Sequence, residues 1–138
     1  MDIRMDSRIL FVSPHVQDAR SLAEMLNEIS IPVVHALSLK DALSKLRAST
    51  FGVVLTEARL GDGSWLDLLE VTRPSGAELI VTDAWADAQF WAMAINLGAY
   101  DMLAQPFQGS EVRRVLACAS SRQQSAKAAA VICTSTTA

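Results

Sequence analysis

The stretch FGVVLTEARLGDG, residues 51–63, joins a run of apolar residues to one acidic residue, Glu57, and then to a glycine-rich turn. Its first part, residues 51–56, is short and rich in branched side chains, which is typical of a strand buried on both faces of a sheet. In open α/β sheets the functional crevice lies outside the carboxyl ends of the strands. A carboxylate at this position therefore indicates a functional site.

Four other stretches have the same character, and with residues 51–56 they predict five buried strands. They are residues 8–12, 32–37, 78–82 and 100–104. Helical patterns lie between and after these strands, the first over residues 19–29 and the others starting at Ser38, Ser64, near Asp87 and at Ser110. Strands that alternate with helices imply right-handed crossovers and a parallel sheet covered on both faces. The expected fold is a three-layer, doubly wound α/β domain.

Composition limits the classes of partner. The chain has 138 residues, and its 51% of hydrophobic residues is enough for one core. Lys and Arg number 12 against 15 Asp and Glu, so no basic stripe is available for nucleic acid. Cys118 and Cys133 lack metal-ligand spacing, and neither a signal-peptide core nor a long apolar run is present. We expect a soluble cytoplasmic protein that binds neither nucleic acid nor membrane.

The order of motifs resembles the receiver domain of bacterial response regulators, the chemotaxis-regulator fold of two-component signalling. The motifs that carry the resemblance are RILFV, FGVVLTEARLGDGSWLDLL, ELIVTDAWAD and LGAYDMLAQPF. It implies a flavodoxin-like sheet of five strands in the order 2-1-3-4-5, with the domain over residues 7–120. Residues 121–138 then form either an extension of the last helix or a linker, and the chain is either complete or a fragment of a longer regulator.

In that family an aspartate at the end of the third strand accepts a phosphoryl group from a histidine kinase. An acidic pair after the first strand holds Mg²⁺, and a Thr or Ser and a Lys bind the phosphoryl oxygens. All of these places differ in this sequence: Glu57 matches the phosphoacceptor, Ser13 and Pro14 the acidic pair, Asp83 the Thr or Ser, and Gln105 the Lys. Ser and Pro do not offer the charged oxygen that Mg²⁺ prefers. The resemblance therefore predicts a degenerate receiver that holds no metal and no cofactor.

Glu57 has two interpretations. Its extra methylene could imitate the longer phospho-aspartate and keep the domain permanently active. The alternative, which we favour, is a polar residue over the crevice that bonds backbone donors or water. The family's switch uses a hydroxyl donor, and Asp83 can donate only when it is protonated. Two facing carboxylates would also repel each other or share a proton.

Three nearby residues are given structural roles. His15 follows the first strand, and without a second His or Cys beside it we interpret it as lining the pocket. His35 lies within the second strand and is interpreted as a packing residue. The GDGS segment lacks the other residues of a phosphate-binding loop, so Asp62 is interpreted as a surface turn residue before the helix cap at Ser64.

The predicted fourth helix, residues 87–97, is apolar nearly all round, although a surface helix normally keeps a polar face. Either one side contacts a partner, or both sides pack inward because the loop that contains Trp85 folds over them. Receiver domains generally use the face of the fourth helix, fifth strand and fifth helix for contacts. The candidate interaction residues are Phe90, Trp91, Met93 and Met102.

The favoured function is a non-enzymatic, degenerate receiver domain that acts by protein contact. Its expected partners are a histidine kinase, an output domain, another regulator or a second copy of the chain. The competing hypothesis is a small α/β ligand-binding module or enzyme that reuses the crevice around Glu57, His15 and Asp83, but no nucleophile–base pair is recognisable. A DNA-binding regulator would need an output domain beyond residue 138.

Overall fold

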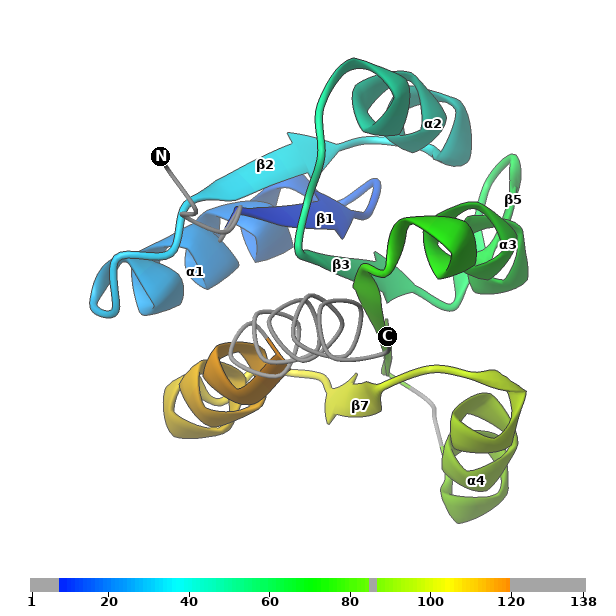
Figure 1. Cartoon of the computed structure of the whole chain (residues 1–138). Coiled ribbons are helices and arrows are strands. Elements are labelled where there is room, and N and C mark those ends of the chain that lie inside the picture. Colours follow the sequence, from blue (N-terminus) through cyan, green and yellow to red (C-terminus); the bar gives the residue numbers. More distant parts are fainter. Residues whose placement is uncertain (1–7, 85–86, 120–138) are drawn as a thin grey trace, which may run out of the picture.

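Five parallel strands form a sheet at the centre of the domain, and helices cover both faces of this sheet (Figure 1). The computed structural model describes residues 8–84 and 87–119. In chain order the elements are β1 (Ile9–Val12), α1 (Val16–Asn27), β2 (Val33–Ala36), α2 (Leu39–Ala48), β3 (Val53–Glu57), β4 (Arg59–Leu60), β5 (Gly63–Ser64), α3 (Trp65–Ser75), β6 (Glu78–Asp83), α4 (Ala88–Leu97) and β7 (Asp101–Ala104). A further helix, called the C-terminal helix below, runs through residues 109–119.

The sheet has the order β2-β1-β3-β6-β7, and every neighbouring pair in it is parallel. When the two short strands β4 and β5 are left out of the count, this is the predicted order 2-1-3-4-5. Three of the predicted helix starts are confirmed, because Ser38, Ser64 and Asp87 each accept a hydrogen bond from a backbone N–H group of the first turn. Such caps satisfy donors that a helix leaves unpaired at its start. The first helix was predicted over residues 19–29 and runs over Val16–Asn27 instead, and Ser110 lies inside the C-terminal helix.

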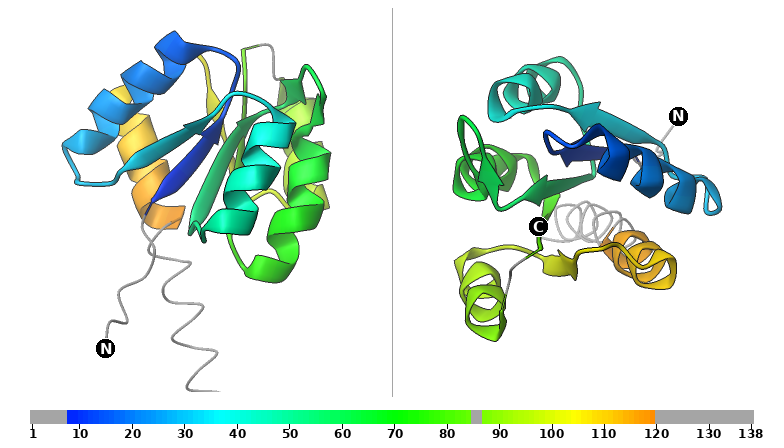
Figure 2. Two further views of the ribbon diagram at one scale, coloured as in Figure 1. Left: turned by 90° about the horizontal axis from the view of Figure 1, so that it is seen from above. Right: turned by 180° about the vertical axis from the view of Figure 1, so that it is seen from behind.

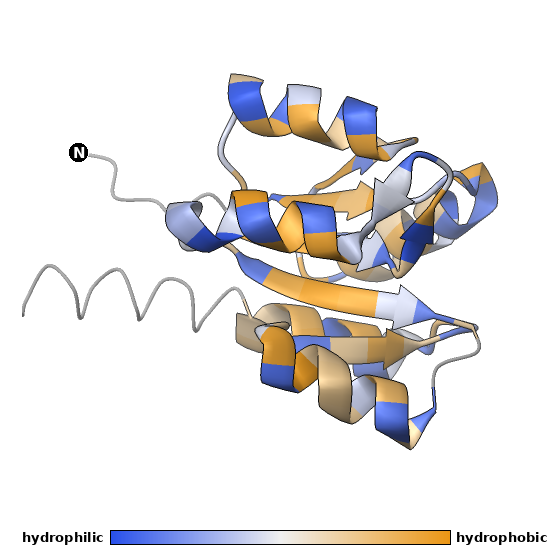
Figure 3. Cartoon of the chain, turned by 90° about the vertical axis from the view of Figure 1, so that its right-hand side faces the viewer, coloured by the Kyte–Doolittle hydropathy of each residue, from blue (hydrophilic) through white to orange (hydrophobic). Residues whose placement is uncertain are grey.

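The strands are apolar along their whole length because both faces of the sheet are buried. In β1, Ile9 and Phe11 belong to one core cluster and Leu10 and Val12 belong to the other. The first cluster lies against α1 and the C-terminal helix, and the second lies against α2, α3 and α4 (Figure 2). Figure 3 shows this burial pattern in the hydropathy of the residues: the strands are mainly apolar, and the helices around them carry both apolar and polar residues.

The turn over residues 61–64 contains more structure than predicted, because β4 and β5 pair there as a short antiparallel hairpin. Asp62 is exposed, as predicted for a turn residue. Its carboxylate also accepts hydrogen bonds from the backbone N–H groups of Leu39 and Lys40, at 2.9 and 3.0 Å. These bonds lower the pKa of Asp62 and tie the hairpin to the start of α2.

Gly98 ends α4 in a backbone conformation that favours glycine, with φ of +126°. Its N–H group donates to the carbonyls of Ala94 and Ile95. A Cβ atom at this position would lie 2.8 Å from the guanidinium of Arg73, which itself donates to the Leu97 carbonyl at 2.6 Å. The glycine before the last strand, part of one of the motifs behind the family resemblance, is thus favoured by backbone geometry, whereas the flexible Arg73 side chain could move away from a Cβ atom.

Some predictions fall on parts of the chain outside the described residues. Trp85 and the tail over residues 121–138 lie there, and so do the predicted domain limits at residues 7 and 120. The domain limits stay predictions. Within residues 8–84 and 87–119, no helix combines the length and the apolar character needed to cross a membrane.

Candidate functional site

The candidate site lies at the carboxyl ends of the central strands, where Glu57 ends β3, Asp83 ends β6 and Ser13 follows β1. Glu57 and Asp83 line one cavity of about 450 Å³ together with Arg59 and Thr82. This is the sheet edge where open α/β folds bind their ligands. The sequence-based placement of the crevice residues at this edge agrees with the structure.

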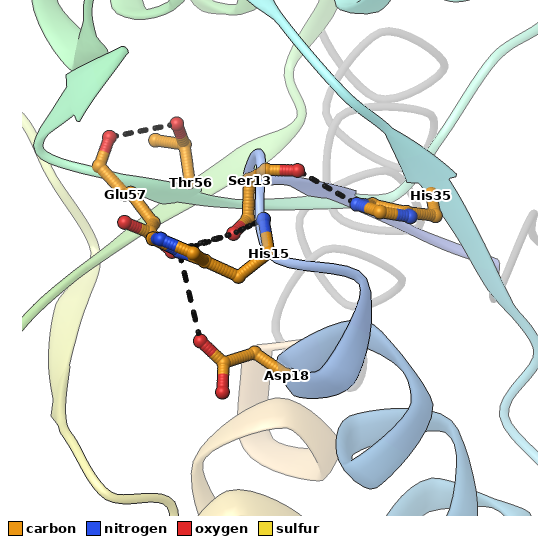
Figure 4. Close-up of polar contacts among 6 residues, drawn as sticks. All are labelled: Ser13, His15, Asp18, His35, Thr56 and Glu57. Carbon is orange, nitrogen blue, oxygen red and sulfur yellow. Dashed lines mark hydrogen bonds and ion pairs between the residues drawn. The ribbon is translucent and has the colours of Figure 1, made fainter.

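Glu57 is held by two side chains from the segment between β1 and α1 (Figure 4). The hydroxyl of Ser13 donates to Glu57 Oε2 at 2.5 Å, and Nδ1 of His15 lies 3.0 Å from the same oxygen. Ser13 is fully buried, and the Glu57 side chain is only 15% exposed. We expected Glu57 to bond backbone donors or water, but its protein partners are side chains, because β1 and β3 are adjacent and bring Ser13 within reach.

His15 is an ion-pair partner of Glu57 as well as a residue that borders the crevice. It is the N-cap residue of α1, and its backbone N–H donates to the Ser13 hydroxyl at 3.0 Å. Asp18, in the first turn of α1, has a carboxylate oxygen 3.8 Å from His15 Nδ1. The hydrogen bond with Glu57 and the charge of Glu57 raise the pKa of His15 above its ordinary value of 6.5, and Asp18 adds to this. The sequence prediction missed Asp18, although its i,i+3 spacing from His15 was a usable signal.

His35 orders the same segment from the neighbouring strand. Its Nε2 donates to the backbone carbonyl of Ser13 at 2.7 Å. Its ring stacks on Phe11, with the centroids 5.9 Å apart and the planes at 25°. The interpretation of His35 as a packing residue is therefore incomplete, since the ring packs on the core and also fixes the backbone beside the crevice.

No family model matches this sequence. Among curated proteins, the transcriptional regulatory protein TdiR of Thauera aromatica is 32% identical over 108 residues, which are 77% of this chain and 48% of TdiR. The response regulator protein PilR of Pseudomonas aeruginosa is 30% identical over 106 residues, or 74% of this chain and 24% of PilR. The acid tolerance regulatory protein ActR of Sinorhizobium medicae is 27% identical over 113 residues, and the chain spans 58% of its length. These relatives are thus considerably longer than this chain.

Solved structures of receiver domains have the same fold. The beryllofluoride-activated NtrC4 receiver domain dimer matches with a TM-score of 0.78 and 22% identity, over 85% of this chain and 98% of that one. The receiver domain of a putative LuxO repressor from Vibrio parahaemolyticus matches with a TM-score of 0.83 and 18% identity, over 91% and 98%. The chain therefore has the fold of a response-regulator receiver domain, and its curated relatives of 27–32% identity are named as regulators.

The other predicted crevice residues, Pro14, Asp83 and Gln105, lie at the ends of strands on the same edge of the sheet, and among the described residues no hydrogen bond joins them to the Glu57 carboxylate. Pro14 is exposed at the start of the β1–α1 connection. Gln105 follows β7 and precedes Pro106 through a cis peptide bond. Its Nε2 is a buried side-chain nitrogen without a hydrogen-bond partner among the described residues. Gln105 and Asp18 line the same small cavity of about 140 Å³.

The predicted interaction residues do not share one surface. Met102 is only 2% exposed, so its assignment to an interaction face is wrong: β7 is covered here, and Met102 packs in the core cluster next to α4. Phe90 is half-buried and meets Trp65 edge to face at 6.4 Å. Met93 lines a cavity of about 430 Å³ with residues of α3. Trp91 is 40% exposed. Phe90 thus packs inward, whereas the side chains of Trp91 and Met93 are accessible to solvent.

The ion pair between His15 and Glu57 should make the free energy of unfolding depend on pH. Because the pKa of His15 is higher in the folded state, its contribution is fully present below the ordinary value of 6.5 and is lost as pH rises through the folded-state pKa. His15 is largely exposed, so we expect a loss of only about 0.2–1 kcal/mol between about pH 6 and about pH 8. Urea unfolding with a chelator present measures it. His15→Gln should remove this part of the pH dependence, and an unchanged slope in that variant would refute the assignment.

Proposed function

We propose that this receiver domain signals by contact with other proteins and does not run a Mg²⁺-dependent phosphorylation cycle at Glu57. The observation that carries the proposal is the pairing of the Glu57 carboxylate with the Ser13 hydroxyl and the His15 imidazole. Both partners contact Oε2 of the carboxylate that would have to attack a phosphodonor. In-line phosphoryl transfer requires the attacking oxygen to be held in a near-attack geometry, and a carboxylate already bonded to two side chains is less free to adopt it.

The residues at the site do not fit the Mg²⁺ ion that the family resemblance implies. Mg²⁺ requires near-octahedral coordination, mostly by oxygen ligands and water. The Ser13 hydroxyl directs its proton at Glu57, and Pro14 has no side-chain ligand atom. A nitrogen ligand, His15 Nδ1, lies next to the remaining carboxylate. Without the ion and without a lysine at position 105, the site lacks the two cations that offset the charge of the phosphoryl group in the family pattern.

The proposed partners are signalling proteins: a histidine kinase, an output domain, another regulator or a second copy of this chain. The curated relatives are longer proteins named as regulators, and one structural neighbour is a receiver domain dimer. One exposed apolar side of α4 supports a contact role, since Trp91 and Ile95 are each 40% exposed there. Exposed apolar groups of this size are a frequent feature of interaction surfaces.

The competing proposal is a ligand-binding module or enzyme that uses the crevice. The cavity of about 450 Å³ beside Glu57 and Asp83 is the observation in its favour. Its volume lies in the range of small-molecule sites, but the cavity is lined by only one half-buried carboxylate pair and few apolar groups. Native mass spectrometry of freshly purified protein decides between the two, because a ligand that stays bound would favour this second function.

Treatment with acetyl phosphate and Mg²⁺ is expected to leave the intact mass of the protein unchanged. The positive control is a variant of this chain in which five crevice residues are replaced by those of the family pattern. These replacements are Ser13→Asp, Pro14→Asp, Glu57→Asp, Asp83→Thr and Gln105→Lys. The restored variant, if folded by circular dichroism, should gain one phosphoryl group. A gain in the wild-type protein that disappears in Glu57→Gln would overturn the proposed function.

A further inference from the structure

We propose that His15, Asp18 and Glu57 form a binding site for a divalent transition-metal ion of the Zn²⁺ class. Each residue offers one ligand atom, and the three atoms lie within 4.8 Å of one another. His15 Nδ1 is at the centre of the group, 3.0 Å from Glu57 Oε2 and 3.8 Å from Asp18 Oδ2 (Figure 4). The inference goes beyond the proposed function, since it holds whether or not the domain signals by contact.

The separations suit a shared ion. Zn²⁺ binds imidazole nitrogen and carboxylate oxygen at about 2.0–2.2 Å, so two ligand atoms of a tetrahedral site lie roughly 3.4 Å apart. The separations of 3.0 and 3.8 Å from His15 Nδ1 bracket this distance, and the third pair, within 4.8 Å, would have to close by at most about 1.4 Å. His15 and Asp18 are 61% and 41% exposed, so their side chains can rotate to close the gap without disturbing the core.

The chemistry of the ligands selects the class of metal. One imidazole and two carboxylates suit Zn²⁺, Co²⁺ or Ni²⁺, whereas Mg²⁺ and Ca²⁺ are bound chiefly through oxygen. The first turn of α1 contributes a partial positive charge that opposes a cation, but the two carboxylates outweigh it. The Ser13 hydroxyl, bonded to Glu57, would orient that ligand from outside the coordination sphere.

Gln105 gives a second observation at the same place. Its buried Nε2 donor has no hydrogen-bond acceptor among the described residues, although buried polar groups are normally paired. Gln105 borders the small cavity that Asp18 also lines. A water molecule bound to an ion at Asp18 would bring an oxygen into this region and supply the missing acceptor. The unpaired amide thus leaves a polar position beside Asp18 that such a water molecule would fill.

Metal binding would join the start of α1 to the end of β3. In the metal-free pair, Nδ1 of His15 carries the proton that faces Glu57; the ion takes the place of this proton, which leaves to solvent. The three ligands come from two segments that are 42 residues apart in the sequence at His15 and Glu57. A bound ion should therefore raise the thermal stability of the domain, and the increase should grow with the logarithm of the metal concentration once this exceeds the Kd.

The test uses the full chain with Cys118→Ser and Cys133→Ser, which removes thiolate ligands, after treatment with a chelator. Zn²⁺ is titrated by calorimetry and Co²⁺ by its visible absorption. We expect one saturable site, with affinity lowered at least tenfold in His15→Gln and in Asp18→Asn. Asp62→Asn is the matched control, because it removes an exposed carboxylate from a different helix start. It should bind like the parent.

The readouts separate loss of ligands from loss of fold. The circular dichroism spectra and melting temperatures of the metal-free variants must match those of the parent. The third ligand is tested in the same way with Glu57→Gln. If that variant does not fold, Glu57→Asp replaces it, because it keeps a carboxylate but shortens its reach. The absence of saturable binding up to about millimolar metal would overturn the proposal. Equal affinity in parent and His15→Gln would do the same, since it would assign the metal to other residues.

Discussion

Phe11→Ala is expected to lower the free energy of unfolding by about 3–5 kcal/mol, the usual cost of removing a fully buried aromatic ring. Phe11 lies in the middle of β1 with no exposed surface. Its ring stacks on His35 and meets Phe107 edge to face at 6.0 Å. Small domains have a total stability of only about 5–15 kcal/mol, so this variant should keep little of it.

The same substitution should disturb the crevice, because His35 rests on Phe11 and holds the Ser13 carbonyl. Urea denaturation followed by tryptophan fluorescence measures the stability. Phe11→Leu is the control: it keeps most of the apolar volume and should cost clearly less than Phe11→Ala. A loss below about 1 kcal/mol in Phe11→Ala would show that the core cluster between the sheet, α1 and the C-terminal helix is not packed around this ring as described.

The second large effect is expected at the surface of α4. Trp91 and Ile95 are one helical turn apart, lie on the same side of α4 and are both 40% exposed. If this side contacts a second copy or a signalling partner, Trp91→Ser with Ile95→Ser should weaken the association at least tenfold, since truncation of a central aromatic residue often costs 2 kcal/mol or more. Analytical ultracentrifugation over a range of concentrations measures self-association, and calorimetry measures binding to a purified histidine kinase.

Met93→Ser is the matched control for this pair. Met93 is 41% exposed and also lies on α4, but it lines the cavity shared with α3 and therefore faces away from Trp91. It should leave the association unchanged within about twofold, whereas a general effect of a more polar helix would weaken binding in both variants. A protein that stays monomeric at high concentration and binds no kinase with or without the pair would refute the contact role of this side.

Local sequence signals determined most of the fold. The helix starts at Ser38, Ser64 and Asp87 were predicted correctly because a cap involves a side chain and a backbone group at most three residues away. The five strands were predicted because burial on both faces demands a continuous apolar run. The strand order came from the family resemblance, and the structure confirms it. The β4–β5 hairpin was missed because two-residue strands leave no periodic pattern.

Tertiary structure alone decided how the crevice residues pair. The sequence placed Glu57 and Ser13 at the same edge of the sheet, but their hydrogen bond joins residues 44 positions apart. The pairing of His15 with Glu57, and the position of Asp18 beside it, likewise depend on where α1 starts relative to the end of β3. Burial of Met102 was also a tertiary outcome, because its neighbours come from the other strands and from α4. Such contacts depend on strand register and side-chain rotamers, and neither is encoded in the spacing of residues along one segment.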